Sequence, residues 1–107
     1  MSGGRLAGKV AIITGASTGL GPVMAKLFVA EGASVLLTAR REDLVREAAA
    51  DCEGKAIAMR ADVTVEGDVI AVVARAVEEF GHVDVMCNNA AAPVSYTHLT
   101  LPTILRV

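Results

Sequence analysis

The chain of 107 residues is 53% apolar and 21% charged, with a formal net charge of −2 at pH 7. That length suits one small domain, and the weak acidity gives none of the basic surface that nucleic acids or membrane surfaces require. The apolar runs are too short to cross a bilayer, and the two dispersed cysteines predict neither a disulfide nor a metal site, which fits a cytoplasmic protein.

Residues 10–88 alternate short apolar runs with apolar residues at helical spacing. The predicted elements in chain order are a strand at 10–15, a helix from Leu20 to a stop at Gly32, a strand at 34–39, a helix opening at 40–43, a strand at 55–61, a helix capped by Thr64 and a strand at 83–88. The predicted buried faces of the three helices are Leu20, Val23, Met24, Leu27 and Phe28; Leu44, Val45, Ala48 and Ala49; and Val69, Ile70, Val73, Ala76, Val77 and Phe80. Strands joined by crossover helices lie parallel, so the pattern predicts a doubly wound α/β fold with helices on both faces of one sheet.

The glycine-rich turn TGASTGLG joins the first strand to the first helix. Such a junction directs backbone N–H groups and a helix dipole at one point, which makes it an anion site if the backbone can approach closely. We assign Gly15 to the turn, Gly19 to close approach and Gly21 to packing of the helix on the strand. Ser17 and Thr18 add hydroxyl donors for phosphate oxygens. The alternative is a glycine-rich turn that binds nothing.

This turn resembles the Thr-Gly-x-x-x-Gly-x-Gly motif of the short-chain dehydrogenase/reductase family. NNAA at 88–91 resembles the Asn-Asn-Ala-Gly segment of the family, with Ala91 in place of its last glycine, and ADVT at 61–64 resembles the segment after its third strand. The resemblance covers residues 7–92 and implies a Rossmann fold that binds NAD or NADP. The cofactor-binding residues that it implies, together with the glycine turn, are Gly15, Ser17, Thr18, Gly19, Leu20, Gly21, Arg40, Asp62, Val63, Asn89 and Ala90.

Simpler roles are open for the polar residues of these motifs. Asp62 lines the adenine pocket if the resemblance holds, but it could instead cap a turn or a helix. Asn88 is expected to support its strand, and both it and Asn89 could serve only the loop backbone. Cys87 is expected to be a packed thiol and His82 a surface loop residue.

The end of the second strand, LLTARRED, bears on the choice of cofactor. An NAD site places an acid where this chain has Ala39, and Arg40 follows, whose guanidinium suits a 2′-phosphate. The family pattern with Arg at this position also implies NADP, so we expect NADP, with NAD possible. The alternative is that Arg40 and Arg41 are solvated and pair with Glu42 and Asp43.

The last fourteen residues differ in composition from the rest, with no Ala, Gly or acid. The family catalyses hydride transfer with a Ser and a Tyr-x-x-x-Lys, but Tyr96 is followed four positions later by Thr100, so no catalytic residue is assigned here. Residues 94–103 back-translate in one frame, which starts within the Pro93 codon, as the mosaic-end adapter of transposase-based DNA libraries. Residues 104–106 leave room for a sample index, and the adapter resumes at Val107 and a stop codon. We therefore expect a partial Rossmann domain at 1–93, truncated after the fourth strand, and a non-native tail. The open edge of that strand and uncovered apolar faces predict an aggregation-prone chain.

The sequence thus predicts the N-terminal fragment of an NAD(P)H-dependent oxidoreductase. The resemblance implies that the parent acts on a small carbonyl/alcohol substrate, similar to the 3-oxoacyl-thioester reductases, and forms homo-oligomers. One alternative is a non-catalytic dinucleotide-binding sensor or scaffold on the same fold, because a fold does not fix a function. Another is an extended sugar-nucleotide epimerase, although that group usually has tighter glycine spacing.

Overall fold

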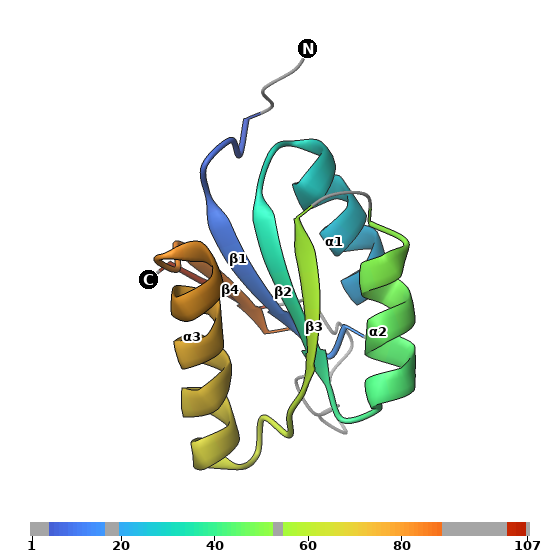
Figure 1. Cartoon of the computed structure of the whole chain (residues 1–107), viewed down its shortest axis with the longest axis vertical. Coiled ribbons are helices and arrows are strands. Elements are labelled where there is room, and N and C mark those ends of the chain that lie inside the picture. Colours follow the sequence, from blue (N-terminus) through green and yellow to red (C-terminus); the bar gives the residue numbers. More distant parts are fainter. Residues whose placement is uncertain (1–4, 17–19, 53–54, 89–102, 107) are drawn as a thin grey trace, which may run out of the picture.

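The computed structural model describes residues 5–16, 20–52, 55–88 and 103–106, the last four by their backbone only. The elements are β1 (Val10–Thr14), α1 (Leu20–Ala30), β2 (Ser34–Ala39), α2 (Glu42–Ala50), β3 (Ala56–Arg60), α3 (Glu66–Phe80), β4 (Val85–Asn88) and β5 (Thr103–Arg106). Figure 1 shows α1 and α2 on one side of the sheet and α3 on the other. Up to β4, every predicted element is present within a few residues of its expected bounds.

The five strands form one sheet in the order β3-β2-β1-β4-β5. β1 pairs in parallel with both β2 and β4, and β2 pairs in parallel with β3. The carboxyl ends of these four strands therefore meet at one edge, which lies at the lower end of Figure 1. This arrangement confirms the doubly wound α/β fold, and in such sheets ligands bind outside the carboxyl ends of the strands.

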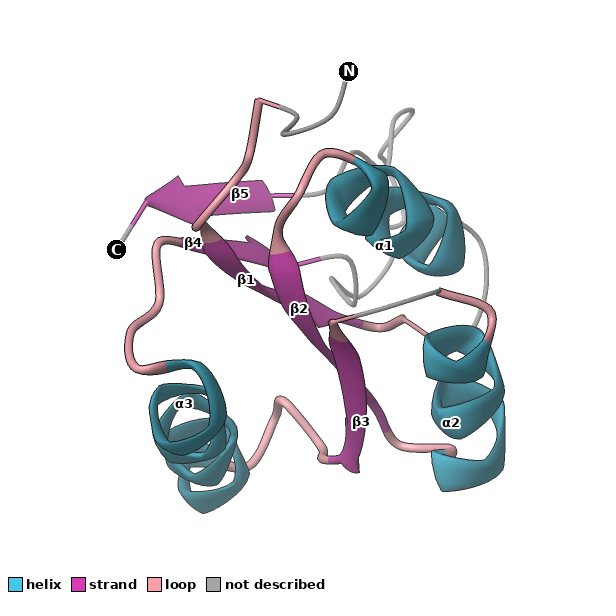
Figure 2. Cartoon of the chain, turned by 45° about the horizontal axis from the view of Figure 1, so that its top comes forward, coloured by secondary structure: helices cyan, strands magenta, loops and turns pink. Residues whose placement is uncertain are grey.

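The core has two halves, because successive side chains of a strand point to opposite faces of the sheet. Ile13 and Leu37 belong to the half under α1 and α2, whereas Ile12 and Leu36 belong to the half under α3. Each of these four side chains is fully buried. Continuous apolar runs, rather than alternating ones, are therefore what this doubly covered sheet requires. The two layers of helices are separated clearly in Figure 2.

The predicted buried face of α1 is partly wrong. Gly21 and Ala25 are the buried residues of this helix, and Met24 and Phe28 are half-buried against the core. Leu20, Val23 and Leu27 were expected inside but are exposed, Leu27 by 59%. Helical spacing alone placed the largest apolar side chains inward, but a helix that lies close to a sheet needs its smallest residues at the contact.

The predicted face of α3 and its cap also need correction. Ala76 is buried as expected, but Val72 is the second buried residue, and Ile70 and Val77 are exposed. The helix begins at Glu66 after Val65, which makes no side-chain capping bond. Thr64 is therefore not the cap, and its hydroxyl instead donates to Asp62. On α2, by contrast, Val45 and Ala48 are buried as predicted.

The outer edge of β4 is paired, contrary to expectation. β5 lies antiparallel to β4, with Cys87 opposite Ile104 and Asn88 opposite Thr103. The sheet therefore continues past its fourth strand into the segment that composition had set apart as a tail.

No helix in the described part of the chain is long and apolar enough to span a membrane.

Candidate functional site

Three polar residues lie side by side where the central strands end. Thr38 of β2 and Asn88 of β4 are both register partners of Thr14 in β1. The Thr14 hydroxyl donates to the Asn88 side-chain oxygen at 2.9 Å and approaches the Cys87 carbonyl oxygen at 3.4 Å. Asn88 thus ties β4 to β1 and supports its strand, as expected.

Thr38 differs from its neighbour although it is equally buried. Its side chain is 0% exposed, and its hydroxyl has no hydrogen-bond partner among the described residues. A buried hydroxyl without a partner costs free energy. At this edge of the sheet, the Thr14 hydroxyl therefore makes a hydrogen bond, whereas the Thr38 hydroxyl on the adjacent strand makes none among the described residues.

The glycine turn has the local geometry that its spacing predicted at both of its described glycines. Gly15 has φ of 61°, a left-handed conformation that a side chain disfavours. A Cβ on Gly21 would lie 2.5 Å from the Ala16 Cα and 3.0 Å from the Gly15 carbonyl oxygen, so only glycine lets α1 pack here. The Ala16 N–H donates to the Thr38 carbonyl oxygen at 3.1 Å, which fixes the turn to the end of β2. These features suit a close approach of backbone to a dinucleotide phosphate.

The remaining residues of this turn are described only at its end. Ser17, Thr18 and Gly19 lie outside the described residues. Leu20, which begins α1, is exposed next to the turn. The first turn of α1 has no acid, whereas α2 has two acids in its first turn and so does α3. A carboxylate at a helix N-terminus would compete with a bound anion, and α1 has none.

Asp62 caps a turn after β3. Its Oδ1 accepts hydrogen bonds from the Thr64 hydroxyl at 2.6 Å and the Thr64 N–H at 2.9 Å. These bonds, chiefly that of the hydroxyl, lower the pKa of the Asp62 carboxyl, and the charges of Arg40 and Arg60 lower it further. The turn-capping alternative is confirmed, while an adenine contact stays a prediction for Asp62 and its half-buried neighbour Val63. A carboxylate has oxygen lone pairs enough for both roles.

The two arginines after β2 behave differently. Arg41 pairs with Asp43 at 3.3 Å, as the solvated alternative expected. Glu42 pairs instead with Arg46 on α2, at 2.8 Å. Arg40 is exposed and makes no ion pair within the part of the chain that the structure describes. It is therefore free to meet an anion at the carboxyl edge of the sheet.

Cys87 and His82 have structural roles. Cys87 is fully buried, and burial raises the pKa of its thiol, so it is a packed thiol as predicted. His82 is half exposed, and its Nε2 lies 2.8 Å from the Asp84 carboxylate. The described residues include no group of three or more His, Cys, Asp or Glu that could hold a metal ion. Asn89 and Ala90 lie outside the described residues.

One charged residue of this edge was missed by the sequence reasoning. Arg60 ends β3, is exposed, and is the register partner of Ala39, directly before Arg40. The sequence does contain a signal, since a strand of apolar residues that ends in Arg places a cation at the carboxyl edge. Which strand lies next to it, however, depends on the pairing register.

The sequence model of the short chain dehydrogenase family matches residues 9–104. The chain belongs to this family. Tropinone reductase-like 1 of Erythroxylum coca is 44% identical over 86 residues, which are 80% of this chain and 32% of that protein. Momilactone A synthase of Oryza sativa subsp. japonica is 45% identical over 87 residues, again 80% of this chain and 32% of that protein.

Solved structures of family members agree with this fold. A 3-ketoacyl-(acyl-carrier-protein) reductase from Brucella melitensis, complexed with NADH, is 41% identical with a TM-score of 0.74, over 77% of this chain and 34% of that one. A short chain dehydrogenase from Mycobacterium smegmatis is 33% identical with a TM-score of 0.79, over 85% of this chain and 40% of that one. The family is one of oxidoreductases that use a nicotinamide cofactor. The present chain spans about a third of the length of the curated relatives named above.

Proposed function

We propose that this chain is the cofactor-binding part of an NADP-preferring short chain dehydrogenase. The observation that carries the proposal of a cofactor-binding role is the turn after β1, in which Gly15 has a positive φ and Gly21 leaves no room for a Cβ. That turn lies beside the N-terminus of α1 and is fixed to β2 through Ala16. A strand, a tight turn and a helix N-terminus in this order form a phosphate-binding junction.

Different described residues would contact different parts of a bound dinucleotide. Gly15 and Gly21 let the backbone approach the pyrophosphate, and the free Arg40 supplies a cation for a ribose 2′-phosphate. Asp62 and Val63 follow β3 at the same edge and would lie against the adenine. When bound, the nicotinamide supplies the hydride acceptor or donor. Residues 14–21 and Arg40 only bind and orient the cofactor.

For the whole parent protein we propose hydride transfer between nicotinamide and a carbonyl/alcohol pair. The support comes from the relatives, among them a 3-ketoacyl-(acyl-carrier-protein) reductase and a hydroxysteroid dehydrogenase from Escherichia coli. Small-molecule carbonyl substrates and a homo-oligomeric parent belong to the same proposal. The non-catalytic sensor or scaffold is the competing function, and a parent reading frame without a Ser and a Tyr-x-x-x-Lys would favour it.

The cofactor proposal is tested by calorimetric titration of the 107-residue chain with NADPH and with NADH. We expect tighter binding of NADPH, and Arg40→Asp should remove that preference because a carboxylate repels the 2′-phosphate. The loss of one charge-assisted contact should lower the affinity for NADPH roughly tenfold. Arg46→Gln is the matched control, since Arg46 pairs with Glu42 on α2. Equal binding of both cofactors by the unsubstituted chain would contradict the NADP preference.

A further inference from the structure

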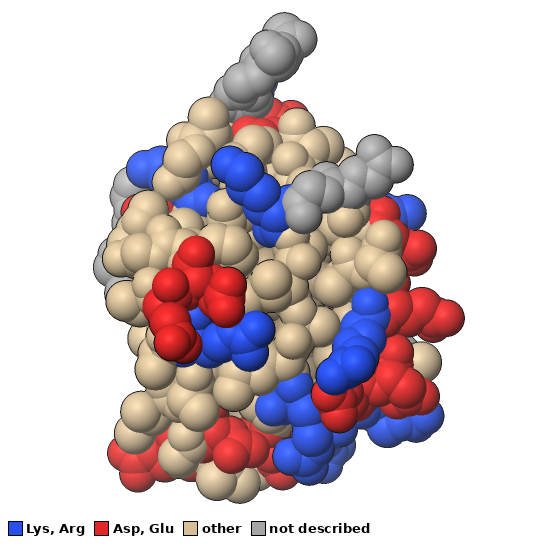
Figure 3. Space-filling model, in the orientation of Figure 1, with Lys and Arg blue, Asp and Glu red and all other residues tan. Residues whose placement is uncertain are grey.

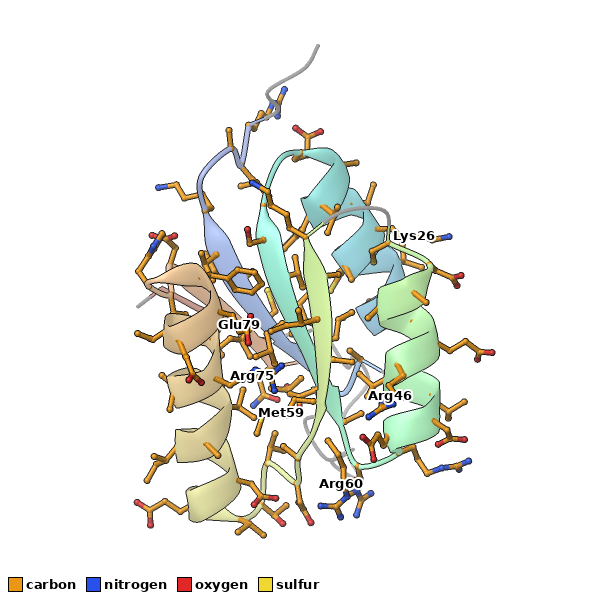
Figure 4. All side chains as sticks on the ribbon, in the orientation of Figure 1. Lys26, Arg46, Met59, Arg60, Arg75 and Glu79 are labelled. Atoms are coloured by element: carbon orange, nitrogen blue, oxygen red, sulfur yellow. The ribbon has the colours of Figure 1, made fainter. Side chains whose placement is uncertain are left out.

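Two arginines lie together at the carboxyl edge of the sheet. Arg60 is the last residue of β3, and its register partner in β2 is Ala39, whose next residue is Arg40. Both arginines are exposed. Figure 4 shows Arg60 beyond the lower end of β3, and Figure 3 shows basic atoms at this end of the molecule, with acidic atoms beside them. The pairing of β2 with β3 therefore places two cations from distant parts of the sequence in one small area.

Neither of these arginines has an ion-pair partner among the described residues, which separates them from the other arginines with known partners. Arg41 pairs with Asp43, Arg46 with Glu42 and Arg75 with Glu79. In Figure 4, Arg46 lies on the α2 side and Arg75 beside Glu79 on the α3 side. Each of these three arginines therefore makes a direct ion pair, whereas Arg40 and Arg60 make none among the described residues.

Two acids that follow β3 accept hydrogen bonds from groups other than these arginines. The Asp62 Oδ1 accepts two bonds from Thr64, and the Asp68 Oδ2 accepts the Asp62 N–H at 2.9 Å. The Asp62 carboxyl nevertheless feels both guanidiniums, because Arg40 and Arg60 are the two charged groups that lower its pKa. Both guanidiniums therefore lie close enough to the Asp62 carboxyl to act on it electrostatically. Two like charges at one edge of the sheet favour the binding of an anion between them.

We propose that Arg60 is a second specificity-determining residue, which selects with Arg40 a nucleotide that bears a phosphate on the 2′ position of its adenosine ribose. This inference rests on the proposed NADP preference and extends it to a residue of β3. A phosphate monoester carries a charge of about −1.5 to −2 at neutral pH. One guanidinium balances only part of that charge, and a second one from the neighbouring strand increases the part that is balanced. The forked donors of arginine suit phosphate oxygens better than a lysine ammonium does.

The test uses the 107-residue chain and the cofactor fragments adenosine 2′,5′-bisphosphate and adenosine 5′-monophosphate, titrated by calorimetry. The variants are Arg60→Gln, Arg60→Lys and Arg40→Gln, with Arg75→Gln as the matched control on α3. Circular dichroism and a thermal melt check that each variant is folded. Adenosine 3′,5′-bisphosphate serves as a second probe that tests whether the position of the phosphate matters.

We expect the unsubstituted chain to prefer the 2′-phosphorylated fragment, and Arg60→Gln to reduce that preference by roughly tenfold. Arg60→Lys should keep part of it, and binding of the monophosphate should change by less than about twofold in all variants, because the 5′-phosphate lies at the glycine turn. If Arg60→Gln keeps the full preference while Arg40→Gln loses it, Arg60 has no such role and the NADP proposal survives. If the unsubstituted chain shows no preference, the NADP proposal itself fails. Equal losses for both fragments in a folded Arg60→Gln would also overturn the inference.

Discussion

Thr14 and Thr38 are register partners on adjacent strands, and only one of their two hydroxyls has a described hydrogen bond. Thr14 donates to the Asn88 side chain at 2.9 Å, whereas the Thr38 hydroxyl has no partner among the described residues. Both residues are almost completely buried. Substituting valine at each position therefore compares a bonded with an unbonded hydroxyl at the same depth in the same sheet.

Thr14→Val should destabilise the chain. The substitution keeps the shape of the side chain but removes the donor that ties β1 to β4 through Asn88. Loss of one partner of a buried hydrogen bond costs about 1–3 kcal/mol. Urea unfolding followed by circular dichroism measures the change, and a free energy of unfolding equal to that of the unsubstituted chain would contradict it.

Thr38→Val, in contrast, should not destabilise the chain. Because the hydroxyl is fully buried without a described partner, a methyl group in its place removes a desolvation cost of about 1–3 kcal/mol at most. We expect the free energy of unfolding to stay level or rise. A clear decrease in the same urea experiment would show that the hydroxyl bonds to a group outside the described residues.

Gly21→Ala should destabilise α1 and weaken cofactor binding. The added Cβ would lie 2.5 Å from the Ala16 Cα, so the helix or the glycine turn must shift. Overpacking of this kind costs about 1–3 kcal/mol. Gly67→Ala is the matched control, because its Cβ meets nothing within 4 Å in α3, and alanine in a helix should stabilise by about 0.5–1 kcal/mol. Equal effects of the two substitutions on the urea midpoint would contradict the prediction.

The Asp84 carboxylate should make the free energy of unfolding depend on pH in the acid range. Its Oδ2 accepts the Val10 N–H at 2.9 Å and lies 2.8 Å from His82 Nε2. The bond from Val10, more than the charge of His82, lowers the carboxyl pKa below its ordinary 3.8. Because the folded-state pKa is the lower one, this stabilisation is complete above the ordinary value and is lost as the pH falls through the lowered pKa.

The variant Asp84→Asn should therefore be less stable than the unsubstituted chain at neutral pH, and the difference should shrink as the pH falls below the ordinary carboxyl pKa. Thermal melts between neutral pH and strongly acid pH measure it. Glu78→Gln is the control, since Glu78 is exposed on α3 and its side chain makes no hydrogen bond in the described part of the chain. A difference that is constant over this range would rule out the carboxylate as its source.

Sequencing of the source DNA across the Pro93 codon tests the interpretation of residues 94–107. We infer that the native frame departs from this sequence after Ala92 and encodes a Ser and a Tyr-x-x-x-Lys. Two observations argue against this interpretation: the family match runs to residue 104, and β5 pairs with β4. A long read that encodes VSYTHLTLPTILRV followed by a stop would refute the adapter interpretation.

The parts of the fold that sequence predicted well are those fixed by local chemistry. The β2 run and the burial of Val45 and Ala48 follow from apolar pattern alone. The roles of Gly15 and Gly21 also followed, because a positive φ and a close helix contact each exclude a side chain. Such constraints act within a few residues, so spacing is enough to detect them.

The parts that sequence missed depend on contacts between distant segments. The exposed Leu27 and Ile70 sit at helical spacing with other apolar residues of their helices, and only the approach of each helix to the sheet decides which side chains are inside. Arg60 became part of the candidate site only through the register that joins β3 to β2. The interactions of Asp62 with Thr64 were likewise one of two alternatives that periodicity cannot separate.

The strand order has a consequence for how this protein is made. β1 emerges first from the ribosome but occupies the middle of the parallel strands, and its second neighbour is β4. Synthesis at about 5–20 residues per second leaves several seconds between these two strands. During that time the β4-facing edge of β1 has no native partner and can pair with other nascent chains. Slower translation of the segment between β1 and β4 should therefore lower the yield of folded protein.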